Sequence, residues 1–184
     1  MTCIVGIADG ERVWIGADSA GVAGWSVTIR ADTKVFTNGP MVFGFTTSFR
    51  MGQLLRHALA VPKHFEGDVD RWLCTDFINA VRGCLKDGGF ATTKDGAERG
   101  GHFLIGYRGR LYSVDSDFQV GEPVDQYAAA GCGDDLALGS LHSTTGQPDD
   151  RIRRALLAAE YFSGGVSGPF HIVEGGHVAE MENR

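Results

Sequence analysis

The hydrophobic pattern of the first 46 residues is that of short strands. Four strand-like stretches follow one another: CIVGIA, ERVWIGADS, a stretch near TIRADTKVF, and MVFGFTT. Turn-forming residues stand at Asp9-Gly10 and at Asn38-Gly39-Pro40. The N-terminal quarter of the chain is therefore predicted to be β-structure.

From Arg50 onward the apolar period changes from that of strands to that of helices. Apolar residues recur at helical spacing up to Pro62, and again from about Asp70 to Leu85, where a glycine pair at 88–89 ends the pattern. Each predicted helix is apolar on one face only, which indicates that both lie against a sheet.

The second half of the chain repeats this order. Residues 86–101 form a glycine-rich, charged segment without an apolar face and are predicted to be a flexible loop. HFLIGY and RLYSVD flank Arg108-Gly109 as a hairpin, and strand-like sequence continues to about residue 130. Two helices are then expected, one over 134–141 and a longer one that starts after Pro148-Asp149-Asp150 and ends at Ser163-Gly164-Gly165. PFHIVE and HVAEM would close the chain as a hairpin.

The order of strands, two helices, strands, two helices and strands predicts the fold class. Single alternation of strands and helices would favour a parallel sheet, and it is not seen. We expect an α+β domain spanning residues 1–184, in which two antiparallel sheets form the inner layers and helices cover both outsides.

Composition narrows the function classes. The net charge is −6 without a dense Lys/Arg run, so neither a nucleic-acid partner nor an anionic membrane is expected. No apolar run approaches the roughly 20 residues of a membrane span, and no signal peptide is recognisable, so a cytoplasmic protein is expected. The four cysteines have no CxxC spacing and are expected to be free thiols rather than zinc ligands.

Thr2 is the first residue that suggests chemistry. Methionine is usually removed before a small residue, and Thr2 would then carry a free α-amine beside its own hydroxyl. With a three-residue turn over 9–11, Thr2 would face Asp18 across the first hairpin; a two-residue turn would place Ala17 there instead. Asp18 ends an apolar run, where a carboxylate is either a strand-end cap or a buried charge that needs a partner.

Lys34 interrupts the strand-like sequence TKVF and is the natural partner for Asp18, although a solvent-exposed strand residue is the alternative. An α-amine with a pKa near 7.7 to 8.0 can accept the proton of a hydroxyl close to neutral pH. An ammonium group nearby would lower the pKa of this amine and stabilise the alkoxide, and a carboxylate would orient the ammonium. Thr2, Asp18 and Lys34 thus supply the parts of an N-terminal nucleophile.

Several motifs in order make the sequence resemble the proteasome β-type peptidases, including bacterial HslV-like subunits. TCIVGIADGERVWIGADS resembles the family's first hairpin, and the 16-residue steps from Thr2 to Asp18 and from Asp18 to Lys34 match the family spacing. The other matching segments are GFTTS, GYRGRLYSVD, AAGCGDDLALGSL and EYFSGGVSGPFHIV. The resemblance implies the αββα Ntn-hydrolase fold and an N-terminal threonine endopeptidase.

The resemblance also implies roles for individual residues. Thr2 would be the nucleophile, Asp18 and Lys34 would support it, and the Thr47 backbone amide would bind the oxyanion. Thr47 stands where the family has a glycine, which narrows the cleft.

A second group would lie beside the Thr2 amine: Cys132, Glu160 and Ser163. Cys132 replaces a serine and is a weaker hydrogen-bond partner, and Glu160 replaces an aspartate. These two replacements are expected to affect the rate of the reaction and the transfer of protons in the site.

By the same resemblance, the chain would form a homo-oligomeric ring that degrades unfolded polypeptide supplied by a partner ATPase unfoldase. No cofactor is expected to be required. The Ser163–Gly165 loop could bind a structural monovalent or divalent cation, or it could simply cap a helix. Removal of Met1 would suffice for activation.

Two other functions stay open at this point. The chain could be a catalytically silent relative with a structural or assembly role, in which a retained Met1 blocks the amine. It could also be an Ntn amidase that acts on a small molecule.

Overall fold

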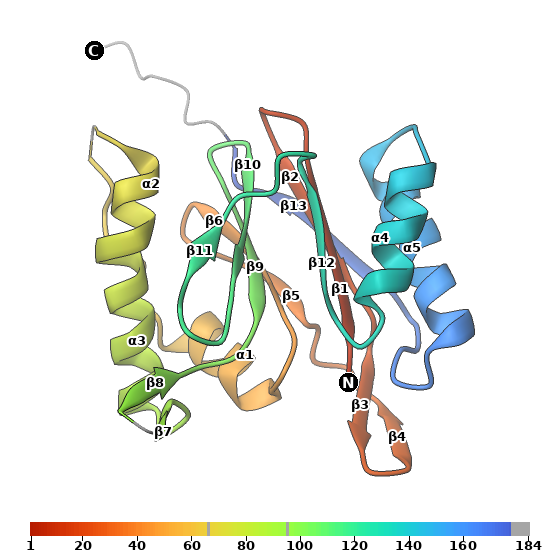
Figure 1. The fold of residues 1–184 in the computed structure, drawn as a ribbon, viewed down its shortest axis with the longest axis horizontal. Helices are drawn as coiled ribbons and strands as arrows, with labels where there is room; N and C mark the ends of the chain where they lie inside the picture. Colours follow the sequence, from red (N-terminus) through yellow and green to blue (C-terminus); the bar gives the residue numbers. More distant parts are fainter. Residues whose placement is uncertain (66, 95, 178–184) are drawn as a thin grey trace.

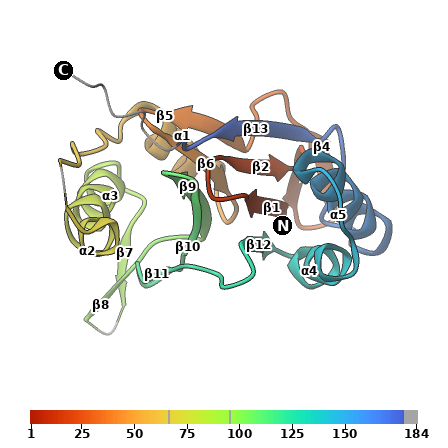
Figure 2. The same ribbon diagram turned by 90° about the horizontal axis from the view of Figure 1, so that it is seen from above.

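Two antiparallel sheets lie face to face at the centre of this computed structural model, and helices cover both outer faces (Figures 1 and 2). The structure describes residues 1–65, 67–94 and 96–177. The first sheet has the strand order β12-β1-β2-β13, and the second has the order β11-β10-β9-β6-β5. The predicted four-layer αββα sandwich is confirmed.

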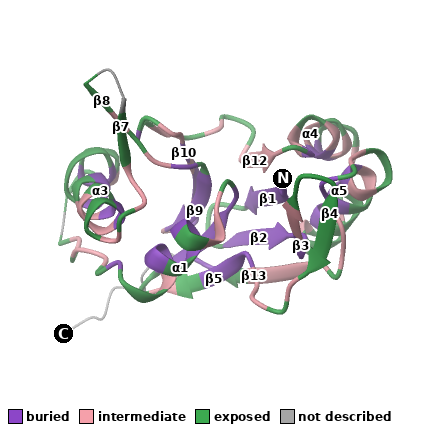
Figure 3. Ribbon diagram, turned by 90° about the horizontal axis from the view of Figure 1, so that it is seen from below, coloured by how far each residue is buried: buried purple, intermediate pink, exposed green. Residues whose placement is uncertain are grey.

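The strands of the first sheet come from both ends of the chain: β1 (Cys3–Ala8), β2 (Val13–Ala17), β12 (Tyr127–Gly131) and β13 (His171–Gly175). Those of the second sheet come from its middle: β5 (Val35–Asn38), β6 (Met41–Phe45), β9 (Phe103–Tyr107), β10 (Arg110–Val114) and β11 (Val120–Gly121). Every residue of β1, β2, β6 and β9 is buried, because these strands have a packed layer on each face. The purple strands at the centre of Figure 3 show this burial.

The helices divide between the two outer layers. The second sheet is covered by α1 (Phe49–His57) and by one continuous helical stretch made of α2 (Val69–Trp72), a π-helical turn η1 (Leu73–Phe77) and α3 (Ile78–Asp87). The first sheet is covered by α4 (Asp134–Ser143) and α5 (Pro148–Phe162). All four helical regions agree with the predicted ones. None of the helices in the described ranges is long and apolar enough to cross a membrane.

The turn of the first hairpin differs from the predicted one. Ala8 pairs with Val13, so residues 9–12 form the turn and Ile4 faces Ala17. The Asp9 carboxylate accepts hydrogen bonds from the amides of Glu11 and Arg12 at 2.9 and 2.8 Å, which stabilises this longer turn. Neither predicted register is correct.

Two hairpins on the surface were not predicted. Residues 20–29 form β3 (Ala20–Ala23) and β4 (Ser26–Ile29), so the strand expected near TIRADTKVF begins only at Val35. Within the predicted loop 86–101, β7 (Thr92–Lys94) pairs with β8 (Ala97–Arg99). β4 and most of β8 are exposed, and such strands leave no apolar alternation in the sequence. The last predicted strand, HVAEM, lies at 177–181, almost wholly outside the described residues.

Candidate active site

A buried ion pair stands where β1, β2 and the start of β5 meet. Lys34 Nζ lies 2.7 Å from Asp18 Oδ1, and each residue is only 1% exposed. Unpaired charges are very costly to bury, so this lysine and this carboxylate stabilise one another. Lys34 is therefore a buried partner of Asp18, not a solvent-exposed strand residue.

Backbone amides hold the Asp18 carboxylate in place. Oδ1 accepts a hydrogen bond from the Cys3 amide at 3.0 Å, and Oδ2 accepts from the amides of Ala20 at 3.0 Å and Ser167 at 3.3 Å. The carboxylate thus caps the end of β2 and also pairs with Lys34. Both roles suggested by the sequence apply at once.

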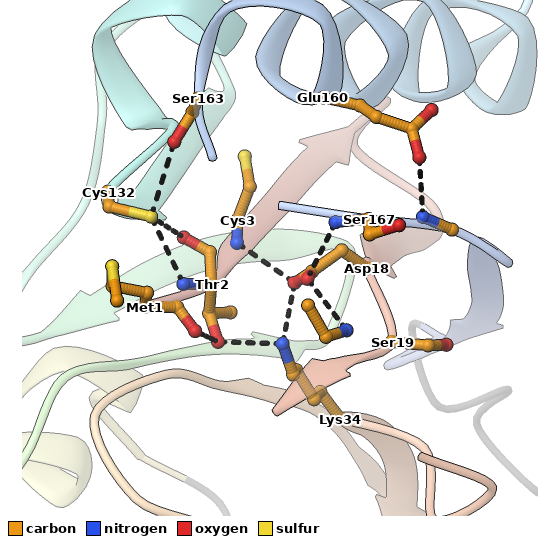
Figure 4. Close-up of polar contacts among 12 residues, drawn as sticks. Met1, Thr2, Cys3, Asp18, Ser19, Lys34, Cys132, Glu160, Ser163 and Ser167 are labelled. Carbon is orange, nitrogen blue, oxygen red and sulfur yellow. Dashed lines mark hydrogen bonds and ion pairs between the residues drawn. The ribbon is translucent and has the colours of Figure 1, made fainter. Parts of the chain in front are cut away.

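Thr2 contacts this ion pair through Lys34. Its ammonium group donates a hydrogen bond to Thr2 Oγ1 at 2.7 Å, as Figure 4 shows. Asp18 is aligned with Cys3, since the Asp18 amide donates to the Cys3 carbonyl at 3.2 Å. The expected direct pairing of Thr2 with Asp18 is therefore wrong, and the lysine bridges the two side chains.

Desolvation dominates the electrostatics of Lys34. Burial lowers the pKa of its ammonium group from the usual 10.5, and the charge of Asp18 opposes this shift. An ammonium with a lowered pKa gives up its proton more readily than an exposed lysine does. It can both stabilise a negative oxygen and take part in proton transfer.

Cys132 contacts the nitrogen of Thr2. This nitrogen, which is in amide linkage with Met1, donates to Cys132 Sγ at 3.3 Å, and Ser163 Oγ lies 3.5 Å from the same sulfur. The Thr2 hydroxyl donates to the Met1 carbonyl at 2.5 Å. Cys132 is thus brought to the nitrogen, and Ser163 contacts the sulfur of Cys132 rather than the nitrogen itself.

Glu160 has a different place. Its Oε1 accepts a hydrogen bond from the Gly168 amide at 2.7 Å, and Figure 4 shows its side chain directed away from Thr2. Glu160 therefore fixes the segment after α5, which includes the Ser167 amide bound to Asp18. The placement of Glu160 beside the Thr2 amine is not seen.

Ser19 and Ser167 complete the site but were not singled out from the sequence. The Ser19 amide donates to the Ser167 carbonyl at 2.8 Å, and Ser19 Oγ donates to the Pro169 carbonyl at 2.6 Å. These bonds tie the end of β2 to the segment after α5. The sequence offered a way to find both serines, because each lies in a segment that resembles the peptidase family.

Thr47 has a backbone conformation that favours glycine. Its φ is +69°, which is uncommon for a β-branched residue, and its hydroxyl accepts a hydrogen bond from the His102 amide at 3.1 Å. Among the described residues, no acceptor bonds to the Thr47 amide. This backbone donor is therefore available to a ligand in the cleft, in a conformation that costs free energy to hold.

A cleft of about 300 Å³ opens beside Thr2. Its lining includes Gly21 and Thr28 of the β3–β4 hairpin, and Thr46 and Thr47 after β6. A second hollow of about 100 Å³ shares Phe45 and Phe49 with the cleft.

The other nearby thiol is not a competing nucleophile. Cys3 is fully buried, and this burial, with the charge of Asp18, raises the pKa of its thiol well above the usual 9.0. The thiol stays protonated at neutral pH, and a protonated thiol is a poor nucleophile. Cys3 is therefore a poor nucleophile at this site.

The loop suggested as a cation site caps α5. The Ser163 amide donates to the Ala159 carbonyl at 2.9 Å, and the Ser163 carbonyl accepts from the Val166 amide at 3.1 Å. No cluster of three or more His, Cys, Asp or Glu side chains suited to a metal occurs within the described part of the chain. Cation binding by the loop carbonyls stays a prediction.

Comparison with known proteins identifies the fold. No family model and no curated protein matches the sequence. Thiobacillus denitrificans BPH in complex with epoxomicin superimposes with a TM-score of 0.76 at 18% identity, over 97% of this chain and 100% of that one. Thiobacillus denitrificans BPH gives 0.75 at 19% identity, over 96% and 98% of the two chains. Eukaryotic HslV from Trypanosoma brucei gives 0.65 at 16% identity, over 94% and 98%. The fold is that of HslV-like Ntn-hydrolases.

Proposed function

We propose that this chain is an N-terminal threonine endopeptidase, active once the bond between Met1 and Thr2 is cleaved. The observation that carries the proposal is the 2.7 Å contact between Lys34 Nζ and Thr2 Oγ1, in an ion pair with Asp18 that is buried beside a cleft. Cleavage of that bond would put an amine and a hydroxyl on the same residue, next to a buried cation.

The chemistry would begin with proton transfer within Thr2. Its free amine accepts the proton of its hydroxyl, and the oxygen attacks the substrate carbonyl while Lys34 stabilises the negative charge. The tetrahedral intermediate would place its oxyanion against the Thr47 amide. It then expels the leaving amine, which takes the proton from the Thr2 amine. Water, activated by the same amine, hydrolyses the resulting ester and releases Thr2.

Cys132 and Ser163 would assist this transfer. The sulfur lies 3.3 Å from the Thr2 nitrogen and the serine hydroxyl lies 3.5 Å from the sulfur, so the two can orient the freed amine. A thiol is a weak hydrogen-bond partner, which fits a modest contribution from Cys132. Glu160 would act only by positioning the loop that contains Gly168.

The substrate class we propose is unfolded polypeptide. A cleft bordered by a strand and an extended loop suits an extended main chain, whose amide groups can pair with both walls. The resemblance to the peptidase family supports a homo-oligomeric ring supplied by an ATPase unfoldase. The homo-oligomeric ring and the ATPase partner are both parts of this proposal.

The test is peptide hydrolysis by the wild type and by Thr2→Ala. We expect Thr2→Ala to lose hydrolysis of fluorogenic peptides and to keep its fold and assembly state. Thr2→Ser, which retains a hydroxyl, is the matched control and should retain measurable activity. Full activity in Thr2→Ala would show that another group is the nucleophile.

A silent structural protein is the alternative function if Met1 is retained. With Met1 in place, the Thr2 nitrogen is an amide without basic character, and the Thr2 hydroxyl is bonded to the Met1 carbonyl. Intact-mass measurement of the purified protein separates the two functions. A chain that retains Met1 supports the structural role, whereas a chain that begins at Thr2 supports the peptidase.

A further inference from the structure

The sulfur of Cys132 is in direct contact with the backbone of Thr2. It lies 3.3 Å from the Thr2 nitrogen and 3.5 Å from the Thr2 carbonyl oxygen, and the Ser163 hydroxyl lies 3.5 Å from the same sulfur. Figure 4 shows the Cys132 side chain directed at Thr2. A thiol at this distance from a nitrogen can do more than share a hydrogen bond, because an oxidised thiol can form a covalent bond with nitrogen.

Two glycines hold the sulfur in this place. A Cβ atom added at Gly165 would lie 2.6 Å from Cys132 Sγ. Gly131, whose φ is +110°, comes directly before Cys132, and a Cβ atom added there would collide with the Thr2 carbonyl oxygen. Both turns therefore approach so closely that only glycine fits, and the sulfur has little room to move away from the Thr2 nitrogen.

A small oxidant can reach the sulfur, although Thr2 itself is enclosed. Cys132 is exposed in the turn after β12, whereas Thr2 is only 4% exposed. Peroxides react with the thiolate rather than with the thiol. The free amine that removal of Met1 would leave on Thr2 can accept the thiol proton across their contact, so the same neighbour can activate the sulfur and then bond to it.

The thiol of Cys3 is the competing partner for an oxidised Cys132. Cys3 is fully buried among the residues between the first sheet and its helices, and burial with the charge of Asp18 raises the pKa of its thiol well above the usual 9.0. Only a thiolate attacks an oxidised sulfur rapidly, so Cys3 reacts slowly. The Thr2 amine needs no such ionisation and already contacts the sulfur.

We propose that Cys132 is a redox-sensitive site, at which a peroxide drives the formation of a reversible sulfur–nitrogen bond between Cys132 and Thr2. The proposal rests on the proposed function in one respect, because the Thr2 nitrogen must be a free amine. The bond would remove the basic lone pair that the peptidase reaction needs. The oxidised chain would therefore be silent, and small thiols would restore it.

The bond forms in two balanced steps. The Cys132 thiolate attacks one oxygen of hydrogen peroxide, the O–O bond breaks, and a sulfenic acid and water result. The Thr2 amine then attacks the sulfur, the S–O bond breaks, and the oxygen leaves as water with one proton from the amine. The sulfur is oxidised, the peroxide is reduced, and the chain loses two hydrogen atoms.

A small thiol reverses the reaction. Its thiolate attacks the Cys132 sulfur, the S–N bond breaks, and the nitrogen takes up a proton to become the Thr2 amine again. A second thiol molecule then reduces the mixed disulfide on Cys132. The serine that the peptidase family has at this position could not take part, since a hydroxyl is not oxidised in this way.

Peptide mapping after peroxide treatment is the direct test. To make the result independent of natural Met1 removal, the full chain is released from a cleavable fusion so that it begins at Thr2. After hydrogen peroxide without thiols, we expect an intact mass lower by about 2 Da. The tryptic peptides 2–12 and 111–151 should be cross-linked, and dithiothreitol should separate them. Absence of this cross-link would overturn the proposal.

Cysteine variants distinguish the sulfur–nitrogen bond from a disulfide that would join the same two peptides. Cys3→Ala should keep the cross-link, and Cys132→Ser should lose it. Cys74→Ser, which removes an exposed thiol of the π-helical turn, is the matched control and should cross-link like the wild type. In the denatured, cross-linked wild type, iodoacetamide should still alkylate Cys3. A cross-link that needs Cys3, or a Cys3 that resists alkylation, would overturn the assignment to nitrogen.

Peptide hydrolysis separates this proposal from the proposed function. If the chain that begins at Thr2 is active, peroxide should lower its rate at least about tenfold and dithiothreitol should restore it, whereas Cys132→Ser should keep most of its own untreated rate. Full activity of the cross-linked chain would overturn the regulatory role. A chain that forms the cross-link but never hydrolyses peptides would instead count against the proposed function and leave the sulfur–nitrogen bond supported.

Discussion

At the scale of single residues, the decisive feature is an ammonium group buried beside a hydroxyl. Lys34 donates to Thr2 Oγ1 and to Asp18 Oδ1 at 2.7 Å each, and the carboxylate is held by three backbone amides. Removal of the lysine would leave a buried carboxylate without its counter-charge. The same residue therefore bears on stability and on the proposed chemistry.

Lys34→Met should be inactive and less stable. Loss of one partner from a buried ion pair costs about 3–5 kcal/mol, so the free energy of unfolding measured in urea should fall by roughly that amount. Lys63→Met removes an exposed lysine and should stay within about 0.5 kcal/mol of the wild type. A Lys34→Met protein as stable as this control would contradict the importance of the pair.

The lowered pKa of Lys34 predicts a pH dependence of stability. The unfolded chain binds the Lys34 proton up to about pH 10.5, whereas the folded chain releases it at a lower pH. Between these two values the unfolded state holds more protons, so the free energy of unfolding rises with pH. The stability of the wild type relative to Lys34→Met should therefore increase as the pH is raised from neutral toward 10.5.

Denaturant unfolding of both proteins at several pH values measures this difference. Groups common to the two proteins largely cancel in the subtraction, which isolates the contribution of residue 34. A difference that stays flat or falls over this range would mean that folding does not lower the pKa of Lys34.

At this scale the sequence allowed a partial prediction. The sequence grouped Thr2, Asp18 and Lys34, and the structure brings Lys34 into contact with both of the others, although the predicted hairpin register was wrong. The turn over 9–12 depends on which amides Asp9 accepts from, and apolar periodicity carries no such information. The direction of Glu160 toward Gly168 likewise depends on a loop conformation with no periodic signal.

At the scale of elements, close packing of β2 on α5 fixes the sheet that carries Thr2. A Cβ atom added at Gly16 would lie 2.4 Å from Ile152 Cγ2 of α5 and 3.2 Å from Ile172. Such a distance is far below van der Waals contact. Gly16 is therefore required for the close approach of the helix to the strand.

Gly16→Ala should destabilise the protein by about 1–3 kcal/mol, because the extra methyl group overpacks this contact. Gly139→Ala is the matched control, since Gly139 lies on α4 with no atom close to an added Cβ. Alanine there should stabilise the helix by about 0.5–1 kcal/mol. Thermal unfolding of both variants measures the two effects, and equal shifts of the same sign would contradict the packing of α5 on β2.

Elements with a buried face were predictable and exposed ones were not. The apolar periodicity that predicted the helices α3 and α5 arises because one face of each helix packs on a sheet. The β3–β4 and β7–β8 hairpins have no such contact, so their sequences show turn residues but no alternation toward a core. Surface hairpins of this kind cannot be predicted from a sequence pattern that arises from burial.

At the scale of the whole molecule, the sandwich brings distant segments to one end of the first sheet. Thr2 lies directly before β1, Asp18 directly after β2 and Lys34 directly before β5 of the second sheet. Cys132 and Ser163 come from the turn after β12 and from the end of α5. The order of strands and helices predicted the four layers. The meeting of residues 130 positions apart followed only from the resemblance to a known family.

The central claim is that the nitrogen and the hydroxyl of Thr2 act together in the mature protein. The most direct test is intact-mass and peptide-mapping analysis of wild type and Thr2→Ala after incubation with epoxomicin, the compound in complex with the structurally similar BPH. We expect the wild type to begin at Thr2 and to carry one inhibitor molecule on that residue, with Thr2→Ala unlabelled. Hydrolysis of peptides by a chain that still begins with Met1, or equal labelling of both proteins, would contradict this claim.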